Sequence, residues 1–413
     1  MKKQILFSLT ALLAVMLACA NPVSGTNTPP NVETIVASTL SALTAPVPEN
    51  AATSQPPNQE PVQGDIPSLL PHTMYFLNND GAGIVQVYRL ERDGKSLTQL
   101  TFEPVKVEDY DVSTVDGSVV YVSDNKLYTV NADGSSRSMI VDGGPRDENQ
   151  PFYNAITNPV WSPNGQTIAF GFKGLNFYSI ISGQYNNVLA DQISDVGNGL
   201  LVPKEMYRPE SYTVDGSKLI ITLGYYEGAS TAIYYPNGNA LVRMSGDPTA
   251  FICCGSANWV SDGSSFFSGN DSMGMFSSGL WRVDAATGQV TTLLSGDPGN
   301  GTFNFADAPY LAPDGQLYFF YTSLPNTTEF YDHTPLQLVR SAPDGVTNRT
   351  VLRPDTFELM NQALWSPDAS FVIVALAPIR DVYIGGLAEL VYTDGQKPSI
   401  SLLPFVMEMK WGP

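Results

Sequence analysis

The sequence predicts an all-β protein: a seven-bladed β-propeller, with a six-bladed ring as the alternative, that follows a disordered tether. Three observations predict this fold. A hairpin motif recurs along residues 72–413, a second hairpin follows each copy, and the two ends of this region supply complementary parts of one unit. The 413 residues are 43% hydrophobic and 11% aromatic, so the chain can bury a large core.

The first 18 residues are predicted to be a lipoprotein signal peptide. Two lysines precede an uncharged apolar run from Ile5 to Ala18, which is too short for a stable membrane span. Its end, Met16-Leu17-Ala18-Cys19, resembles the lipobox of bacterial lipoproteins, and this resemblance implies lipidation of Cys19. An ordinary signal peptide cleaved nearby is the alternative.

Residues 19–71 are predicted to be a lipidated linker rich in Pro, Thr, Ser and Asn. Positions 20–71 hold ten prolines and no aromatic, Lys or Arg residue. Such a segment cannot bury enough apolar surface to offset the loss of chain entropy. The folded region is therefore expected to span residues 72–413.

The first hairpin of each unit is marked by a turn of Asp or Asn followed by Gly. Asp and Asn side chains bond back to nearby amides and Gly supplies the positive φ, so these pairs predict tight turns. Stretches rich in strand formers follow each turn. The turns are Asp116-Gly117, Asn164-Gly165, Asp215-Gly216, Asp262-Gly263, Asp314-Gly315 and Asp368-Ala369, and the strands after them are 119–123, 167–170, 218–223, 265–267, 317–321 and 371–375.

A second hairpin turn occurs in every unit, and there are seven of these but only six complete first hairpins. The turns are at residues 93–94, 133–134, 182–183, 237–238, 287–288, 344–345 and 394–395. Strands at 74–77, 85–90 and 97–101 lack a first strand, and residues 405–411 supply one at the other end of the chain. The two ends thus complete one blade, which closes the ring and removes open sheet edges. The resulting period is about 49 residues, which is typical of propellers.

Four tryptophans recur just before the first turn, at positions 161, 259, 365 and 411. We interpret them as packing residues between blades, because aromatic side chains dominate core energetics. The segments Trp161-Ser162-Pro163-Asn164-Gly165, Trp365-Ser366-Pro367-Asp368 and residues 127–134 resemble the WD-repeat-like propeller repeats of the TolB family. That resemblance implies a rigid exported propeller, often a binding platform, and no particular ligand.

One face of the predicted propeller carries the long connections, and function concentrates on long loops held by a rigid scaffold. These connections are residues 142–157, 190–210, 224–231, 268–279, 321–335 and 376–388. Aromatic and polar side chains on them suit the binding of a sugar or a peptide. The predicted ligand or partner residues are Tyr153, Tyr207, Tyr226, Phe330, Tyr331, Asp332, His333 and Tyr383.

Cys253 and Cys254 are the remaining thiols of the predicted exported chain. They are a candidate vicinal disulfide, because an exported pair has only each other as an intramolecular partner. Their Cα atoms, about 3.8 Å apart, lie closer than in ordinary disulfides, so such a bridge would be strained.

Catalytic motifs are scarce in this sequence. The chain has two histidines, His72 and His333, and neither lies near a Gly-x-Ser-x-Gly elbow or in a metal-ligand spacing. No cofactor or metal is predicted. Two carboxylates suffice for glycoside hydrolysis, and the long connections carry Asp147, Glu148, Glu205, Glu227, Asp332 and Asp381 as candidates.

The leading interpretation is a non-catalytic binding platform for an envelope protein or glycan, anchored to a membrane through its lipid alone and facing the extracytoplasmic side as a monomer. A carbohydrate-active enzyme, either a hydrolase or a lyase, and a structural surface protein are the alternatives. The net charge of −19 lacks the basic footprint of a nucleic-acid-binding protein.

Overall fold

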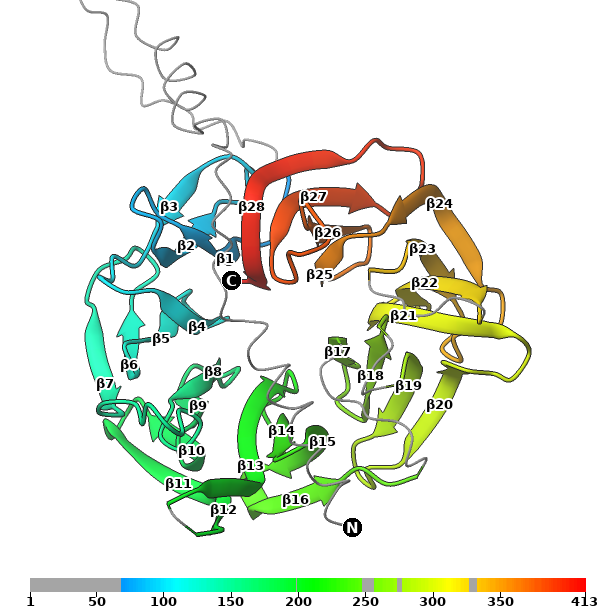
Figure 1. Cartoon of the computed structure of the whole chain (residues 1–413). Helices are drawn as coiled ribbons and strands as arrows, with labels where there is room; N and C mark the ends of the chain where they lie inside the picture. Colours follow the sequence, from blue (N-terminus) through cyan, green and yellow to red (C-terminus); the bar gives the residue numbers. More distant parts are fainter. Residues whose placement is uncertain (1–67, 198, 247–255, 273–276, 327–332) are drawn as a thin grey trace, which may run out of the picture. The chain divides into compact units, whose positions relative to one another are not determined.

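The computed structural model describes residues 68–197, 199–246, 256–272, 277–326 and 333–413. They belong to one structural unit, Asp65–Pro413, in which the strands form a ring of antiparallel sheets (Figure 1). The prediction of an all-β propeller is confirmed. Within the described residues, no helix is long and apolar enough to cross a bilayer.

Antiparallel pairing groups the strands into four-stranded units, which we number as blades in chain order. Blade 1 contains the C-terminal half of β28 (Ile400–Trp411), β1 (Met74–Asn79), β2 (Val85–Leu90) and β3 (Leu97–Gln99). Blade 2 contains β4 (Val107–Val112), β5 (Val119–Ser123), β6 (Lys126–Val130) and β7 (Ser138–Asp142). Blade 3 contains β8 (Thr157–Trp161), β9 (Thr167–Gly171), β10 (Gly174–Ser179) and β11 (Gln184–Ala190).

The other half of the ring follows the same pattern. Blade 4 contains β13 (Leu201–Tyr212), β14 (Leu219–Tyr225), β15 (Gly228–Tyr235) and β16 (Ala240–Arg243), with the short helix η1 (Pro236–Gly238) in its last turn. Blade 5 contains β17 (Ser256–Trp259), β18 (Ser265–Asn270), β19 (Gly279–Asp284) and β20 (Val290–Ser295). Blade 6 contains β21 (Thr302–Leu311), β22 (Leu317–Pro325), β23 (Leu336–Ser341) and β24 (Thr350–Phe357). Blade 7 contains β25 (Met360–Trp365), β26 (Phe371–Leu376), β27 (Gly386–Tyr392) and the N-terminal half of β28. The pairing supports seven units, and the blade number of the closed ring stays a prediction.

The long strand β28 joins the two ends of the propeller. Its first half pairs with β27, and its second half pairs with β1 through Met74↔Trp411 and Leu77↔Met407. A backbone bond from the amide of Gly412 to the carbonyl of Thr73 extends this pairing (2.8 Å). The composite blade therefore forms as the sequence predicts, although the closing strand is continuous with the outer strand of blade 7.

The hydrophobic core is divided among the interfaces between neighbouring blades. At the closing interface, Val406 and Met409 of β28 pack with Met74, Phe76 and Ile373, all of them buried. Similar clusters fill each of the other interfaces among the described strands. Burial between sheets explains why the middle strands are continuously apolar.

The tryptophans lie at these interfaces, as predicted, and two of them are buried there. The indole N–H of Trp365 donates to the carbonyl of Ala308 in blade 6 (2.8 Å), and that of Trp411 donates to the carbonyl of Trp365 (2.7 Å). Trp259 bonds the carbonyl of Ser211 in blade 4 in the same way (3.2 Å). The exception is Trp161, whose buried indole N–H has no hydrogen-bond partner among the described residues.

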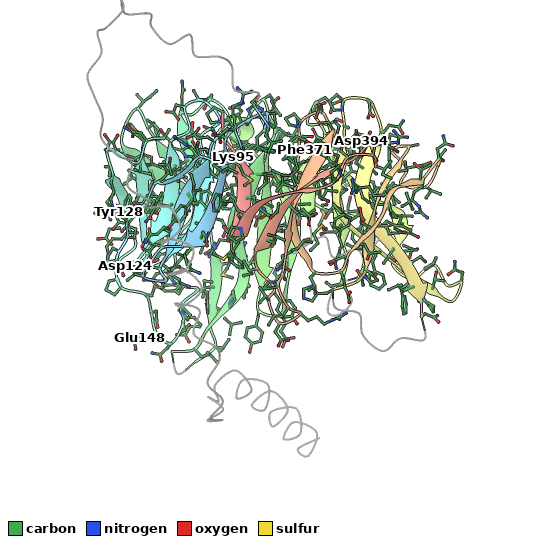
Figure 2. The ribbon with its side chains drawn as sticks, turned by 90° about the horizontal axis from the view of Figure 1, so that it is seen from above. Lys95, Asp124, Tyr128, Glu148, Phe371 and Asp394 are labelled. Atoms are coloured by element: carbon green, nitrogen blue, oxygen red, sulfur yellow. The ribbon has the colours of Figure 1, made fainter. Side chains whose placement is uncertain are left out.

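The tight turns have the predicted chemistry. In each first hairpin the Asp or Asn side chain accepts a bond from the amide two residues on, at 2.8 to 3.0 Å. Ala369, which replaces the usual glycine, has a φ of 56°. Figure 2 shows Lys95 and Asp394, from second-hairpin turns, on one side of the propeller and Glu148, from a long loop, on the other. We call these the tight-turn face and the long-loop face.

Two predicted connections are wrong. Residues 224–231 are a tight hairpin in place of a long connection, because β14 and β15 pair up to Tyr225↔Gly228. Residues 190–210 do not form a loop: they contain β12 (Gln192–Asp195) and the first half of β13, which pair through Ser194↔Val202 and Asp195↔Leu201. The hairpin forms because alternating apolar residues extend the inner strand of blade 4 beyond the blade itself. Its tip is held against the 142–157 loop by Gln150, which accepts from the amide of Leu201 (2.8 Å).

Candidate functional site

A cavity of about 660 Å³ lies where the inner strands of blades 5, 6 and 7 meet the long-loop face. Its wall comes from β17, β21 and β25 and from the connections that follow β18, β22 and β26. Three blades and three long connections thus contribute to one cavity of the size that holds small ligands. The lining includes Asn258, Asp271, Asp307, His333, Gln362 and Tyr383.

Amide side chains build the frame of this cavity. Asn361 donates to the carbonyls of Val382 (3.0 Å) and Gly385 (2.8 Å), which ties the connection after β26 to its inner strand. Gln362 donates to the carbonyl of Met409 (3.0 Å) and accepts from its amide (2.7 Å). These bonds hold the cavity wall against the closing strand, so the lining is preorganised by the backbone of a neighbouring blade.

His333 and Tyr383, two of the aromatic and polar residues predicted to form a binding surface on the long connections, meet at the cavity. Their ring centroids lie 5.1 Å apart with an interplanar angle of 22°. His333 is buried, and its Nε2 lies 2.8 Å from the carbonyl oxygen of Arg380, whereas Tyr383 is 61% exposed. The stack therefore offers one accessible phenol ring on an otherwise anchored pair.

The other described residues of the predicted aromatic surface lie outside this cavity. Tyr153 is exposed on its own loop with the Lys173 ammonium 5.4 Å from its ring centre, and Tyr226 is exposed in a short turn. Tyr207 is buried, because it lies on β13, where the alternation of a strand turns its ring into the interface with blade 3. Its hydroxyl accepts a bond from Gln192 (3.0 Å).

Several predicted positions lie outside the described residues. They are the lipidation site Cys19, the candidate disulfide Cys253 and Cys254, and the loop residues Phe330, Tyr331 and Asp332. The predictions made for them stay predictions.

Two of the carboxylates proposed from the sequence, Glu205 and Asp147, have partners within the protein. Glu205 forms a two-pronged ion pair with Arg243 (both contacts 2.7 Å), and this hydrogen bonding lowers the pKa of Glu205. Asp147 accepts bonds from the amides of Asn149 (2.9 Å) and Gln150 (3.1 Å), which shapes its own loop.

A different acidic cluster, absent from the residues predicted from the sequence, lies on the inner strands of blades 1, 2 and 4. Asp109 on β4 accepts from the amide of Asn158 (2.7 Å). Lys410 on β28 donates to Asp111 (3.1 Å) and to the carbonyl of Tyr110. Glu408, two residues before Lys410, has a φ of 52° and accepts a backbone bond from the hydroxyl of Tyr110.

Burial perturbs these groups strongly. Burial and the nearby Asp109 carboxylate together raise the pKa of Glu408 to about 7, although Lys410 opposes the shift. Glu210 on β13 is accessible to solvent, but the neighbouring inner strands crowd its carboxyl group and raise its pKa to about 7, although a bond from Thr222 (2.8 Å) opposes this. Burial also raises the pKa of Asp109. Perturbed groups of this kind cluster at functional sites.

A signal for this cluster is present in the repeat. Glu408 and Lys410 stand three and one residues before Trp411, and Asp109 and Asp111 stand at the same offsets before Val112, its counterpart in blade 2. An alignment of the inner strands would have shown charges facing one axis. No three or more His, Cys, Asp or Glu side chains among the described residues are grouped so that they could hold a metal ion.

Comparison with known proteins defines the class of fold. No protein-family model matches the chain, and a search of curated proteins finds no match either. Among solved structures, the chain is similar to a prolyl endopeptidase, with 12% identity and a TM-score of 0.52 over 83% of this chain and 49% of that one. It is also similar to an oligogalacturonate lyase in complex with manganese, with 9% identity and a TM-score of 0.50 over 81% of this chain and 86% of that one. The chain thus spans about half the length of the endopeptidase.

TolB from Acinetobacter baumannii is also among the similar structures, with 15% identity and a TM-score of 0.40 over 81% of this chain and 79% of that one. The structural neighbours therefore include TolB, the family that the repeat residues resemble. At these identities the similarities establish a β-propeller fold, and they leave the activity undetermined.

Proposed function

We propose that this protein is an extracytoplasmic binding module that presents the cavity of blades 5, 6 and 7 to a protein or glycan of the cell envelope. The observation that carries the proposal is the meeting of three inner strands and three long connections around one cavity, with the exposed Tyr383 ring beside it. Exposed aromatic rings on rigid frames are typical anchors of binding sites. The net charge of −19 favours a neutral or basic partner.

The test is capture of partners from envelope extract on the immobilised protein, compared between the unaltered protein and two variants. Tyr383→Ala removes the ring at the cavity, and Tyr226→Ala is the matched control, because the two tyrosines are 61% and 62% exposed on the same face. We expect the captured protein or polysaccharide to be lost with Tyr383→Ala and retained with Tyr226→Ala. Equal loss in both variants would place binding on the wider face, outside the cavity.

The proposed location has its own test. Lipidation of Cys19 would place the chain in the membrane fraction, because a diacyl group anchors a protein stably. The Cys19→Ala variant should then appear in the soluble exported fraction. Recovery of this variant with the membranes would contradict the anchor and leave the binding proposal standing.

A carbohydrate-active enzyme is the second candidate, and the inner-strand acids favour it. Glu210 and Glu408, with pKa values raised to about 7, each interact electrostatically with the Asp109 carboxylate, and a general acid works best with a pKa near the operating pH. Release of reducing ends from a polysaccharide panel tests this reading. Loss of that activity in Glu210→Gln or Glu408→Gln, with Glu148→Gln unaffected, would establish a carbohydrate-active enzyme. Release of no reducing ends would exclude such activity on the polysaccharides of the panel.

A further inference from the structure

A second concave site lies between blades 3 and 4 on the opposite side of the propeller. It is a groove of about 500 Å³ bounded by the first-hairpin turns of both blades and by the turn that contains η1. Those turns belong to the tight-turn face, so the groove is separate from the cavity on the long-loop face. We propose that this groove binds a short neutral oligosaccharide.

Aromatic rings from both blades form the floor of the groove. Phe177 of β10 and Tyr234 of β15 contact one another across the blade interface, with ring centroids 5.7 Å apart and an interplanar angle of 34°. Tyr212 of β13 adds a third ring. Because Tyr212 pairs with Leu219 of β14, and Leu219 pairs with Tyr234 of β15, both tyrosines lie on the same face of blade 4. Tyr234 is 1% exposed, whereas Phe177 and Tyr212 are half-buried and present ring surface to the groove. Ring faces at a groove provide the apolar surface against which the C–H face of a sugar packs.

Amide side chains border these rings on both sides. Asn186 pairs with Phe177 across two strands of blade 3, so the amide and the ring project from the same face. Asn237 lies in the facing turn of blade 4. Both are exposed, and neither side-chain amide has a hydrogen-bond partner in the described part of the chain. Each amide can therefore donate and accept at the same time, as sugar hydroxyls require.

Two further amides are oriented by the protein. Asn239 accepts a bond from the hydroxyl of Tyr234 (2.7 Å), and Asn164 accepts from the hydroxyl of Ser162 (2.7 Å) and from the amide of Gln166 (3.0 Å). Because each of these amide oxygens already accepts a hydrogen bond within the protein, the orientation of the side chain is set and its NH₂ group points away from that bond. The groove thus combines two fixed donors with two adaptable amides.

The charge of the groove selects a neutral ligand. Asp215 is the only acidic or basic residue in its lining, and the Oδ1 atom of that carboxylate accepts from Thr213 (2.6 Å) and twice from Ser217 (3.0 and 2.8 Å). No Lys, Arg or His lines the groove to balance an anionic sugar. Two of the lining strands, β10 and β15, are paired on both sides, so they offer no free edge for a peptide to extend.

Binding of trisaccharides to the full-length protein tests the proposal. The probes are maltotriose, cellotriose and chitotriose in its N-acetylated form, with trigalacturonate as the acidic comparison, followed by saturation-transfer NMR and calorimetry. We expect at least one neutral probe to bind at millimolar or lower concentration and trigalacturonate to bind more weakly. The Asn186→Ala/Asn237→Ala variant should weaken binding by about tenfold or more, because it removes the bonds of two amides.

Asn149→Ala on the long-loop face is the matched control and should leave sugar binding unchanged. Loss of sugar binding in Tyr383→Ala but not in the double variant would place the sugar in the cavity of the proposed function and overturn the proposal for the groove. The proposal is overturned if no neutral probe binds, if trigalacturonate binds better, or if the double variant binds as well as the unaltered protein. Binding of an unstructured peptide in the groove, in place of a sugar, would also overturn the proposal.

Discussion

Two tryptophans at equivalent positions differ in one hydrogen bond, and this difference predicts unequal costs for the same substitution. Trp365 and Trp161 both end an inner strand and are similarly buried, at 6% and 9% exposure. The indole N–H of Trp365 donates to Ala308 across the blade interface, whereas that of Trp161 has no partner among the described residues. Replacing either residue by Phe removes the same atoms, so the volume terms largely cancel.

The expected difference follows from the two environments. Trp365→Phe loses a bond worth about 0.5–1.5 kcal/mol, and Trp161→Phe removes an unsatisfied buried donor that costs about 1–3 kcal/mol. Trp161→Phe should therefore be less destabilising than Trp365→Phe by about 1.5–4.5 kcal/mol. Urea unfolding followed by circular dichroism gives both free energies. Equal costs, or a larger cost at Trp161, would refute the hydrogen-bond argument.

Two further predictions concern ring closure and pH. A chain that ends at Pro404 loses the half of β28 that completes blade 1 and should unfold or aggregate. Within the full chain, Met409→Ala should lower the unfolding free energy by about 2–5 kcal/mol, because Met409 is 2% exposed. Met139→Ala, at a half-exposed site, should lower it by under about 0.5 kcal/mol. Native-like urea unfolding of the shortened chain, or equal costs at the two methionines, would contradict the closure. The raised pKa values of Glu210 and Glu408 mean that the folded chain holds protons that the unfolded chain has released, so the unfolding free energy should fall as the pH rises from about 4.5 to about 7. The Glu210→Gln/Glu408→Gln variant should flatten this slope in urea titrations, and an unchanged slope would show that other groups cause it.

The strand and turn pattern could be predicted because its chemistry is local. An Asp side chain that caps the amide two residues on, as in Asp215 with Ser217, needs only a few consecutive residues to specify a turn. Repetition of that turn then revealed the blades and the incomplete units at the two ends. Residues 190–210 do contain the turn residues Asn198-Gly199. The hairpin of β12 with β13 was missed because its length depends on the pairing of the residues on either side of that turn, outside the repeat.

The candidate site could be predicted only in part. His333 and Tyr383 belong to different blades, and their stacking depends on how two long connections fold over the same cavity. Tyr207 has the same residue type as Tyr383 but lies on a strand that turns its ring inward. Residue type on a long connection therefore indicated the face, and the tertiary fold decided which rings remain accessible.

The sequence by itself determined the all-β class, the repeating turns and the complementarity of the two chain ends, because each depends on short-range backbone preferences or on a repeated pattern. Only the tertiary structure decided where solvent is excluded. Asp109, Glu210 and Glu408 are far apart in the chain, and their pKa values are raised because three inner strands bring them to one axis, where neighbouring strands crowd the carboxyl groups and reduce their solvation. Burial and electrostatic coupling depend on distance in space, which no local pattern encodes.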